Sequence, residues 1–403
     1  MVSIQMVHAQ LPSLLLLSDD SLYRQSNALV LATGEARLGS NSLDISFMKK
    51  MVLGGHIDKQ QISDLYSAMG NQNRAGYQAA GELSFYNFRD TLFPDPTWGL
   101  KATLGTNYHG AASFNPTLFS TIFQGNQSLA GDTIDLGPFS LQTQSWQKFG
   151  LGIFNKKTLS GITLSLVEGQ SFQSLIVQQA DMHTSNTGDT ITLAPAGDYW
   201  RSDTTRSGWA NGSGVGVALD LDYNLPLQND MGMISISVRD LGFVKWNDAS
   251  EQYALNHKAV WTGLDVNPWL QNHGDTLSKP NVEDSLVTDR RQGAFVAPLP
   301  LGVHLRYMKR FGRNNYYEAG WSIWPNRAAV PQVYAGVSHS FSNHFMMSGR
   351  LSLGGYTRWG LGAEVQWMPC GTWIVRAGTN AIGGLIFDAA HGRDGYVSIG
   401  RSF

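Results

Sequence analysis

The sequence WGLGAEVQW at residues 359–367 places apolar side chains at every second position. Successive side chains of a β-strand point to opposite faces, so Leu361 and Val365 share one face with the two tryptophans, and Glu364 lies on the other. The stretch therefore predicts a β-strand with one apolar face and an aromatic side chain at each end.

The same period of two recurs along most of the chain from Tyr77 to the C terminus. Residues 98–108 are an early example, close to the ~9–11 residues that a tilted strand needs to cross a bilayer. Turn-rich segments such as 314–315 and 369–371 separate the alternating stretches. A generous count predicts about fourteen strands, in keeping with the even number typical of membrane barrels. The clearest stretches are residues 77–86, 98–108, 148–153, 162–166, 215–223, 234–239, 303–308, 317–323, 345–353, 359–367, 373–377 and 396–403.

The content of the two faces favours a membrane barrel over a soluble β-sandwich, which also alternates. The polar face is rich in Gly, Ser and Thr and poor in Lys and Glu, unlike a solvated exterior, and the apolar face carries Trp or Tyr toward strand ends. In the stretches before the last one, the ionisable residues, Lys148, Asp220 and Asp222 among them, fall on the polar face. We therefore predict an all-β fold, a transmembrane antiparallel barrel with a polar interior.

Some of these ionisable side chains are candidates for lining the lumen. We interpret them as an ion-pair ladder that fills the barrel, with a solute path as the alternative. Asp240, in the segment Asp-Leu-Gly-Phe, is interpreted as a cap of backbone amides at a strand exit. The candidate lumen-lining residues are Glu82, Lys101, Arg239, Asp240, Arg306, Arg350, Arg358, Glu364 and Arg376.

The last strand carries the most specific local pattern. Val397, Ile399 and Phe403 alternate with polar residues, and the sequence ends on this phenylalanine. Outer-membrane barrels characteristically end in this way, which predicts an assembly signal read by the barrel-insertion machinery. Arg401 departs from the pattern in an outward position, where its guanidinium can reach the lipid headgroups. The predicted location is the bacterial outer membrane, after export through the periplasm, with outer-membrane lipid as a partner.

Composition narrows the remaining function classes. The net charge of −2, with no like-charge run, argues against a nucleic-acid partner. Cys370 is the single cysteine, and no histidine pair has metal-ligand spacing. We expect no catalytic residue, no cofactor and no metal site. The sequence has no Gly-x-Ser-x-Gly motif, but an outer-membrane hydrolase is not excluded.

The expected organisation has three parts. Residues 1–10 resemble the tail of a signal peptide, and residues 11–74 form a small plug-like region with short helices at Phe47–Leu53 and Gln60–Met69. Residues 75–403 form the barrel. Two long loops or inserts are expected at 115–136, with a short helix over 118–123, and at 248–297, which is polar and irregular.

Two segments carry a family resemblance. Residues 238–246 (VRDLGFVKW) and 297–301 (APLPL) resemble a family of outer-membrane barrels of unknown function from the bacterial lineage with type 9 secretion. Residues 42–47 (SLDISF), followed by Gly54-Gly55, resemble the N-terminal pattern of the long-chain fatty-acid channel superfamily (FadL-type). The resemblance spans roughly residues 29–403 and implies fourteen strands with an N-terminal plug. It carries over no catalytic residue.

Two functions are compatible with these features. The first is a FadL-like passive channel that binds a hydrophobic or amphipathic small molecule and passes it through the barrel or out of its wall. The alternative is a non-transporting scaffold or accessory barrel of secretion or envelope assembly, with a secretion-system partner. The long segment 248–297 and the family's lineage motivate this alternative.

Overall fold

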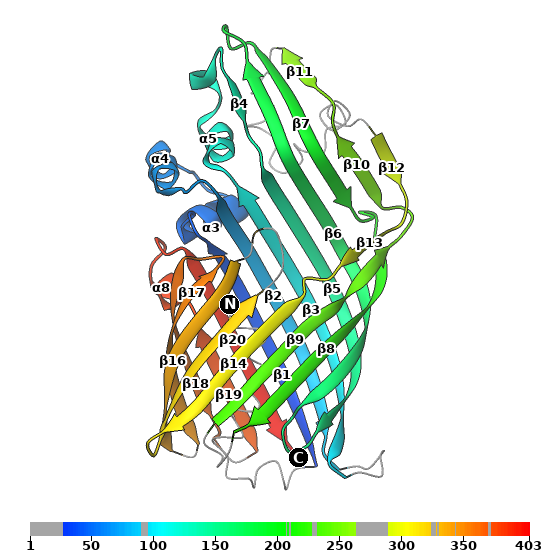
Figure 1. Cartoon of the computed structure of the whole chain (residues 1–403), viewed down its shortest axis with the longest axis vertical. Coiled ribbons are helices and arrows are strands. Elements are labelled where there is room, and N and C mark those ends of the chain that lie inside the picture. Colours follow the sequence, from blue (N-terminus) through cyan, green and yellow to red (C-terminus); the bar gives the residue numbers. More distant parts are fainter. Residues whose placement is uncertain are drawn as a thin grey trace.

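The computed structural model describes residues 27–89, 96–206, 208, 211–227, 232–262, 289–323, 328, 330–342, 344–369 and 372–403. Within them, fourteen long antiparallel strands form a closed barrel (Figure 1), as the period of two predicts. The wall strands are β1 (Ala28–Ser40), β2 (Asn73–Asn87), β3 (Trp98–Phe114), β5 (Phe139–Asn155), β6 (Gly161–Thr184), β8 (Gly214–Pro226), β9 (Gly232–Trp246), β14 (Gly302–Phe311), β15 (Asn315–Ile323), β16 (Val330–Ser342), β17 (Phe345–Gly355), β18 (Trp359–Trp367), β19 (Trp373–Thr379) and β20 (Gly392–Ser402).

The barrel closes at β1, which pairs along its length with both β2 and β20. The expected start of the barrel at residue 75 is therefore wrong, because β1 lies within the region 11–74. Its N-terminal half hides the period of two, since Leu29 and Leu31 face inward while Val30 between them faces outward. The expected signal remnant at residues 1–10 lies outside the described residues.

The two faces of the wall have opposite chemistry. On β18, Leu361 and Trp367 are exposed on the outer face, and Glu364 and Gln366 are buried on the inner face. The same alternation gives β6 an outward leucine at position 164 between inward polar residues. An apolar exterior around a polar interior is the arrangement that a bilayer requires of a barrel.

Connections at the two ends of the barrel differ in length. At the end that holds the C terminus, β14 and β15 are separated only by residues 312–314. At the other end, the β1–β2 connection carries α3 (Ile45–Leu53) and α4 (Lys59–Ala68), and the β19–β20 connection carries α8 (Ile382–Ile386). We call these the short-turn end and the long-loop end. Outer-membrane barrels turn the former to the periplasm and the latter outward.

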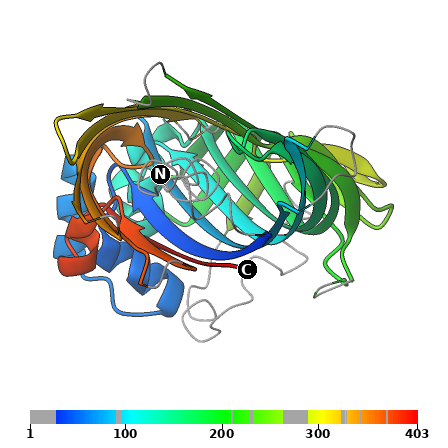
Figure 2. The same cartoon turned by 90° about the horizontal axis from the view of Figure 1, so that it is seen from below.

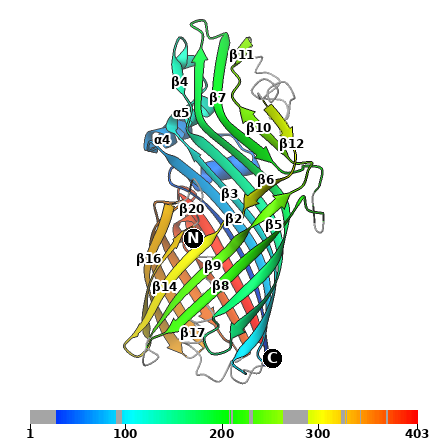
Figure 3. The same ribbon diagram turned by 45° about the vertical axis from the view of Figure 1, so that its right-hand side comes forward.

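The wall continues beyond the barrel on one side of the long-loop end (Figure 3). β6 pairs with β8 in its first part and with β7 over Gln173–Thr184. In the segment 248–297, which was expected to be irregular, the described residues contain short strands too brief for their alternation to be recognised. The shorter elements are η1 (Gln127–Leu129), β4 (Thr133–Asp135), β7 (Thr190–Arg201), β10 (Glu251–Leu255), β11 (Ala259–Thr262), β12 (Asp289–Gln292) and β13 (Phe295–Pro298).

We call the part of the wall beyond the barrel, which contains β7, β10 and β12, the extension. Glu251 links these three strands. It accepts hydrogen bonds from Arg290 at 2.6 Å and from the Tyr253 hydroxyl at 2.7 Å, and it pairs with Arg201. Burial raises the pKa of Glu251, but the hydrogen bonds from Arg290, Tyr253 and Arg201 outweigh burial and hold this pKa below 4.5. The carboxylate form is therefore stabilised by folding.

The extension is expected to loosen in acid. A carboxyl whose pKa is lowered by folding stabilises the fold above its unfolded value and loses this effect as the pH falls through the lowered value. Hydrogen exchange of residues 251–255 should therefore stay slow from neutral pH to about pH 4.5 and accelerate below it, after correction for intrinsic exchange. Glu251→Gln should remove this pH step. A step that persists in the variant would contradict the assignment.

The helices expected in the N-terminal region are present and modest in size. Figure 2 shows α3 and α4 outside the ring of strands, beside α8. Their buried side chains, such as Phe47 and Ile62, pack against the outward-facing Leu38 and Ala75 of the wall. Asp44 caps α3 by accepting a hydrogen bond from the backbone N–H of Phe47 at 2.6 Å. The described helices thus brace the outer wall and do not fill the lumen.

The last strand places its apolar residues outward. Val397, Ile399 and Phe403 are exposed on the outer face. The guanidinium carbon of Arg401 lies 5.3 Å from the centre of the Trp373 ring and 4.9 Å from that of Phe403. These aromatic faces stabilise the outward cation by cation–π contact. The role of the strand as an assembly signal stays a prediction.

Candidate functional site

A β-bulge in β9 turns two consecutive charged side chains into the barrel. The register with β8 shifts between Leu219 and Leu221, so Asp220 lies opposite both Arg239 and Asp240. Asp240 has a φ of 54°, and its backbone N–H donates to Asp220 at 2.8 Å. Asp240 is therefore inside a strand, and its interpretation as a cap at a strand exit is wrong.

Lys148 connects the two carboxylates that the bulge brings together. Its Nζ atom lies 2.9 Å from Asp220 and 2.8 Å from Asp240, and all three side chains are buried. The three residues come from β5, β8 and β9, so one ammonium group bridges strands that are not all neighbours. A buried charge is tolerated only when such partners compensate it.

A second group of charges lies on the same strands β8 and β9 and on β3 and β2. The Arg239 guanidinium bonds directly to Asp222, and the Nζ atom of Lys101 lies 3.9 Å from the same carboxylate. Glu82 on β2 accepts a hydrogen bond from the Ser84 hydroxyl at 2.6 Å. The inner surface of this side of the barrel therefore carries cations and anions in alternation.

The opposite side of the barrel carries a chain of five alternating charges. Arg306 donates to Glu318 at 2.6 Å, and Arg350 lies 3.3 Å from Glu318 and 2.7 Å from Glu364. Arg376 bonds to the other oxygen of Glu364. The chain crosses β14, β15, β17, β18 and β19, so it links strands across the wall by side chains as well as by backbone hydrogen bonds.

Two buried tyrosines add hydrogen bonds to this side of the interior. The Tyr396 hydroxyl donates to Glu364. The Tyr334 hydroxyl lies 3.2 Å from Nε2 of the buried His304, whose ring stacks on the tyrosine with an interplanar angle of 9°. These contacts add hydroxyl and imidazole hydrogen-bonding groups to a charged interior.

Most predicted interior residues lie where the alternation puts them. All of the candidate lumen-lining residues except Arg358 face inward. Arg358 is exposed in the turn before β18 and donates to the carbonyl of Ala68 at the end of α4. Its prediction is wrong because β17 ends at Gly355, so the alternation does not continue through this turn. Whether the others line a solute path stays a prediction.

The structure adds interior residues to the candidate lumen-lining set. Lys148, Asp220 and Asp222 belong to the polar face by alternation but are not among the candidates. Glu318 is a further interior residue outside that set, although it lies between the alternating Tyr317 and Ala319. Strict alternation is the signal that identifies it.

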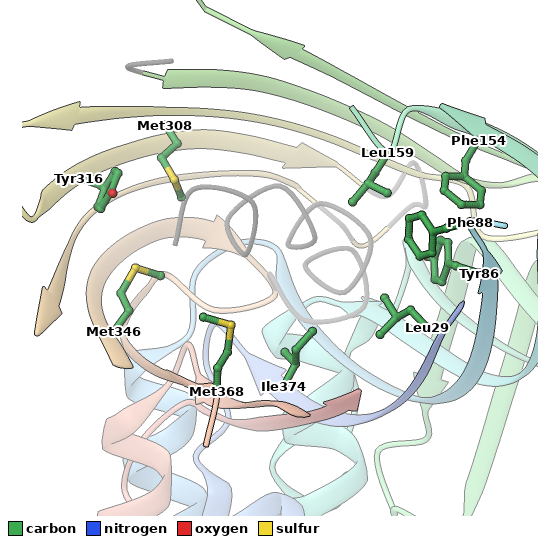
Figure 4. Close-up of a cluster of buried hydrophobic side chains, with 10 residues drawn as sticks. All are labelled: Leu29, Tyr86, Phe88, Phe154, Leu159, Met308, Tyr316, Met346, Met368 and Ile374. Atoms are coloured by element: carbon green, nitrogen blue, oxygen red, sulfur yellow. The ribbon is translucent and has the colours of Figure 1, made fainter. Parts of the chain in front are cut away.

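A ring of apolar side chains lines the interior near the short-turn end (Figure 4). On two strands a member of the ring lies two residues from an interior arginine, on its short-turn side. Met308 comes two residues after Arg306, and Ile374 comes two residues before Arg376. The interior thus changes from charged to apolar along the barrel. The ring consists of Leu29, Tyr86, Phe88, Phe154, Leu159, Met308, Tyr316, Met346, Met368 and Ile374.

An apolar pocket of about 440 Å³ lies outside the wall at the long-loop end. Its walls are α3, α5 (Pro116–Gln124) and the strands β1, β2, β3 and β5, with Leu175 of β6 at its edge. The Phe47 ring of α3 lies 5.6 Å from that of Phe119 and 5.1 Å from that of Phe123, measured between centres. Its lining is almost entirely apolar, which suits an apolar ligand.

Asn115 fixes α5 over this pocket. Its side-chain oxygen accepts from the backbone N–H of Leu118 at 2.8 Å, and its amide donates to the carbonyl of Gly137 at 2.6 Å. The helix begins at Pro116, inside the segment 115–136 where a short helix was expected, and this prediction is confirmed. The cap therefore holds the helix to the chain that enters β5.

Two features are absent from the described residues. No helix there is long and apolar enough to cross a membrane. No group of three or more His, Cys, Asp or Glu side chains in the same residues is arranged to hold a metal ion.

The closed fourteen-stranded wall, apolar outside and charged inside, defines a β-barrel of the outer-membrane type. The sequence profile of a family of unknown function (DUF5723) matches residues 16–376, and the chain belongs to that family. No curated protein matches the sequence significantly.

Several solved structures are similar over almost their whole length. The toluene transporter TodX of P. putida is 10% identical, with a TM-score of 0.43 and coverage of 96% of this chain and 92% of TodX. The toluene transporter TbuX of Ralstonia pickettii is 8% identical, with a TM-score of 0.40 and coverage of 94% and 91%. The CymD monoaromatic hydrocarbon channel is 9% identical, with a TM-score of 0.29 and coverage of 94% and 90%.

Proposed function

We propose that this protein is a passive channel of the bacterial outer membrane for a hydrophobic or amphipathic small molecule, as the resemblance to FadL-type barrels implies. The observation that carries the proposal is the apolar pocket beneath α3 and α5. It lies at the long-loop end, which faces the medium in outer-membrane barrels. We assign it as the site that captures the solute.

The route from the pocket runs laterally. The pocket rests on outward side chains such as Ala75, Ala112 and Leu141, and the apolar outer wall continues from it. An apolar solute gains nothing by entering the charged interior, where the buried groups already bond to one another. We infer that the solute leaves the pocket along the outer wall into the hydrocarbon layer of the membrane. The process needs no cofactor and no catalytic residue.

Occupancy of the pocket can be measured directly. The full-length protein in amphipol would be irradiated with a diazirine-bearing aromatic hydrocarbon, and the labelled peptides would be mapped. We expect labelling of residues 43–53 and 116–124. Ala112→Trp should reduce this labelling about tenfold, because the indole fills space that the probe occupies and so removes apolar burial of the probe worth roughly 1.5 kcal/mol.

Ala102→Trp is the matched control. Ala102 faces outward on the same strand, ten residues from Ala112 and away from the pocket. It should leave the labelling of the helices unchanged. Equal labelling in both variants, or labelling spread evenly over the wall, would contradict the pocket as the capture site.

Transport is tested separately in cells. A deletion strain should take up the same hydrocarbon more slowly, and the wild-type gene, but not the Ala112→Trp allele, should restore uptake. If uptake in the deletion strain is normal and the protein purifies with a stoichiometric protein partner, the channel proposal is contradicted and the scaffold alternative is supported. We also propose, from the motifs at 238–246 and 297–301, that the protein belongs to the bacterial lineage with type 9 secretion. A protein partner would be sought among the components of that secretion system.

A further inference from the structure

Two helical segments far apart in sequence form one unit at the long-loop end. The backbone N–H of Ile45 donates to the carbonyl of Ala390 at 2.8 Å, and that of Ser46 donates to the carbonyl of Asp388 at 2.9 Å. The Asp388 carboxylate lies 3.2 Å from Lys49 Nζ and 2.8 Å from the Arg393 guanidinium. We call α3, α8 and residues 387–390 the platform.

The platform presents large apolar side chains to its surroundings. Val52 and Leu53 at the end of α3 are 75% and 78% exposed, and Ile386 and Phe387 at the end of α8 are 66% and 62% exposed. Two adjoining helices in water do not usually both end in consecutive exposed apolar side chains. These four residues therefore need a covering surface.

The position of the platform identifies that surface. The platform lies outside the ring of strands (Figure 2), where β19 ends after seven residues at Thr379. Leu385 of α8 shares a recess of about 730 Å³ with outward wall residues that include Ala36, Ala377 and Val397. The apolar side of the platform is thus continuous with the wall that faces lipid.

Basic groups accompany the apolar ones. Lys49 and Lys50 lie one turn before the exposed end of α3, and Arg393 lies beside α8. Interfacial helices combine apolar side chains with Lys and Arg that reach the headgroups. Both kinds of group are present on the platform in that arrangement.

We propose that the platform is a membrane-interface anchor, in which Val52, Leu53, Ile386 and Phe387 insert into the outer leaflet and acyl chains fill the recess beneath α8. This inference rests on the proposed membrane location of the barrel. The anchor holds α3, one wall of the apolar pocket, at the surface of the hydrocarbon layer. It therefore keeps the pocket open to lipid.

Depth-dependent fluorescence quenching tests the anchor. In a Cys370→Ser background, Val52→Cys and Ile386→Cys would each be labelled with an NBD fluorophore. The full-length protein would be reconstituted in phosphatidylcholine and phosphatidylglycerol vesicles with doxyl-labelled lipid. Leu361→Cys, on the lipid-facing wall, is the positive control. Thr187→Cys, exposed at the tip of the β6–β7 hairpin, is the control for water.

We expect quenching at positions 52 and 386 of the same order as at 361, with a preference for the shallow doxyl position. Position 187 should be hardly quenched. If 52 and 386 behave like 187 while 361 is quenched, the anchor is refuted and the barrel location stands. If 361 is also unquenched, the membrane location itself fails. Protection of position 52 from water without quenching by lipid would indicate cover by a second copy of the chain and would also refute the anchor.

Discussion

Replacing Glu364 with glutamine should lower the free energy of unfolding by about 3–5 kcal/mol, the cost of leaving buried charges without their partner. Glu364 pairs with Arg350 and Arg376 and accepts a hydrogen bond from the Tyr396 hydroxyl. All of these side chains are buried on the inner face. Glutamine keeps the shape of the side chain but removes the negative charge between two guanidinium groups.

The measurement is reversible urea unfolding of the protein in lipid vesicles, followed by tryptophan fluorescence. Asp289→Asn is the control, because Asp289 pairs with Arg291 at an exposed site. Exposed pairs contribute only about 0–1 kcal/mol. Equal midpoints for the two variants would show that the interior chain of charges does not stabilise the barrel.

The face of these charges was predictable from sequence, but their partners were not. Alternation places Glu364 and Arg350 on the inner face without knowledge of the structure. In the register, however, Arg350 lies opposite Gly362 and Glu364 lies opposite Ser348, so the two form a diagonal pair. A shift of one strand against the next would change every such pair, and the sequence does not state the register.

Asp240 marks the limit of alternation. Ile234, Ile236 and Val238 face outward, and strict alternation would place Asp240 on the lipid face with them. The bulge inserts one residue and returns Asp240 to the interior, where Lys148 compensates its charge. Two adjacent ionisable residues in an alternating strand are therefore a sequence sign of a bulge.

The first strand and the pocket escape sequence-based prediction for different reasons. β1 is hard to recognise because its apolar residues at 29–31 fall on both faces. The pocket was not predictable because it joins residues 43–52 to strand residues near 75, 112 and 141. These stretches meet only when the barrel has closed and α3 has folded onto its outer wall. Local periodicity predicts a strand or a helix, but it does not predict contacts between residues that are far apart in the sequence.

Lys148→Met should cost about 3–5 kcal/mol of unfolding free energy, because it leaves the buried carboxylates of Asp220 and Asp240 side by side without their shared cation. Adding Asp240→Asn removes one of these charges. Asparagine tolerates the φ of 54° at this position. The double variant should therefore be more stable than Lys148→Met alone by about 1–3 kcal/mol, in the same urea experiment.

A second pair of substitutions separates this coupling from general loss of stability. Asp388 lies on the outer platform and pairs with Lys49 and Arg393, away from the barrel interior. Asp388→Asn should add to Lys148→Met within about 0.5 kcal/mol, because distant sites act independently. If Asp240→Asn also proves merely additive with Lys148→Met, the two carboxylates do not repel, and Lys148 acts on one of them alone. If Asp240→Asn restores stability to Lys148→Met and Asp388→Asn does not, the bulge in β9 places a second carboxylate beside Asp220, and Lys148 must neutralise both carboxylates.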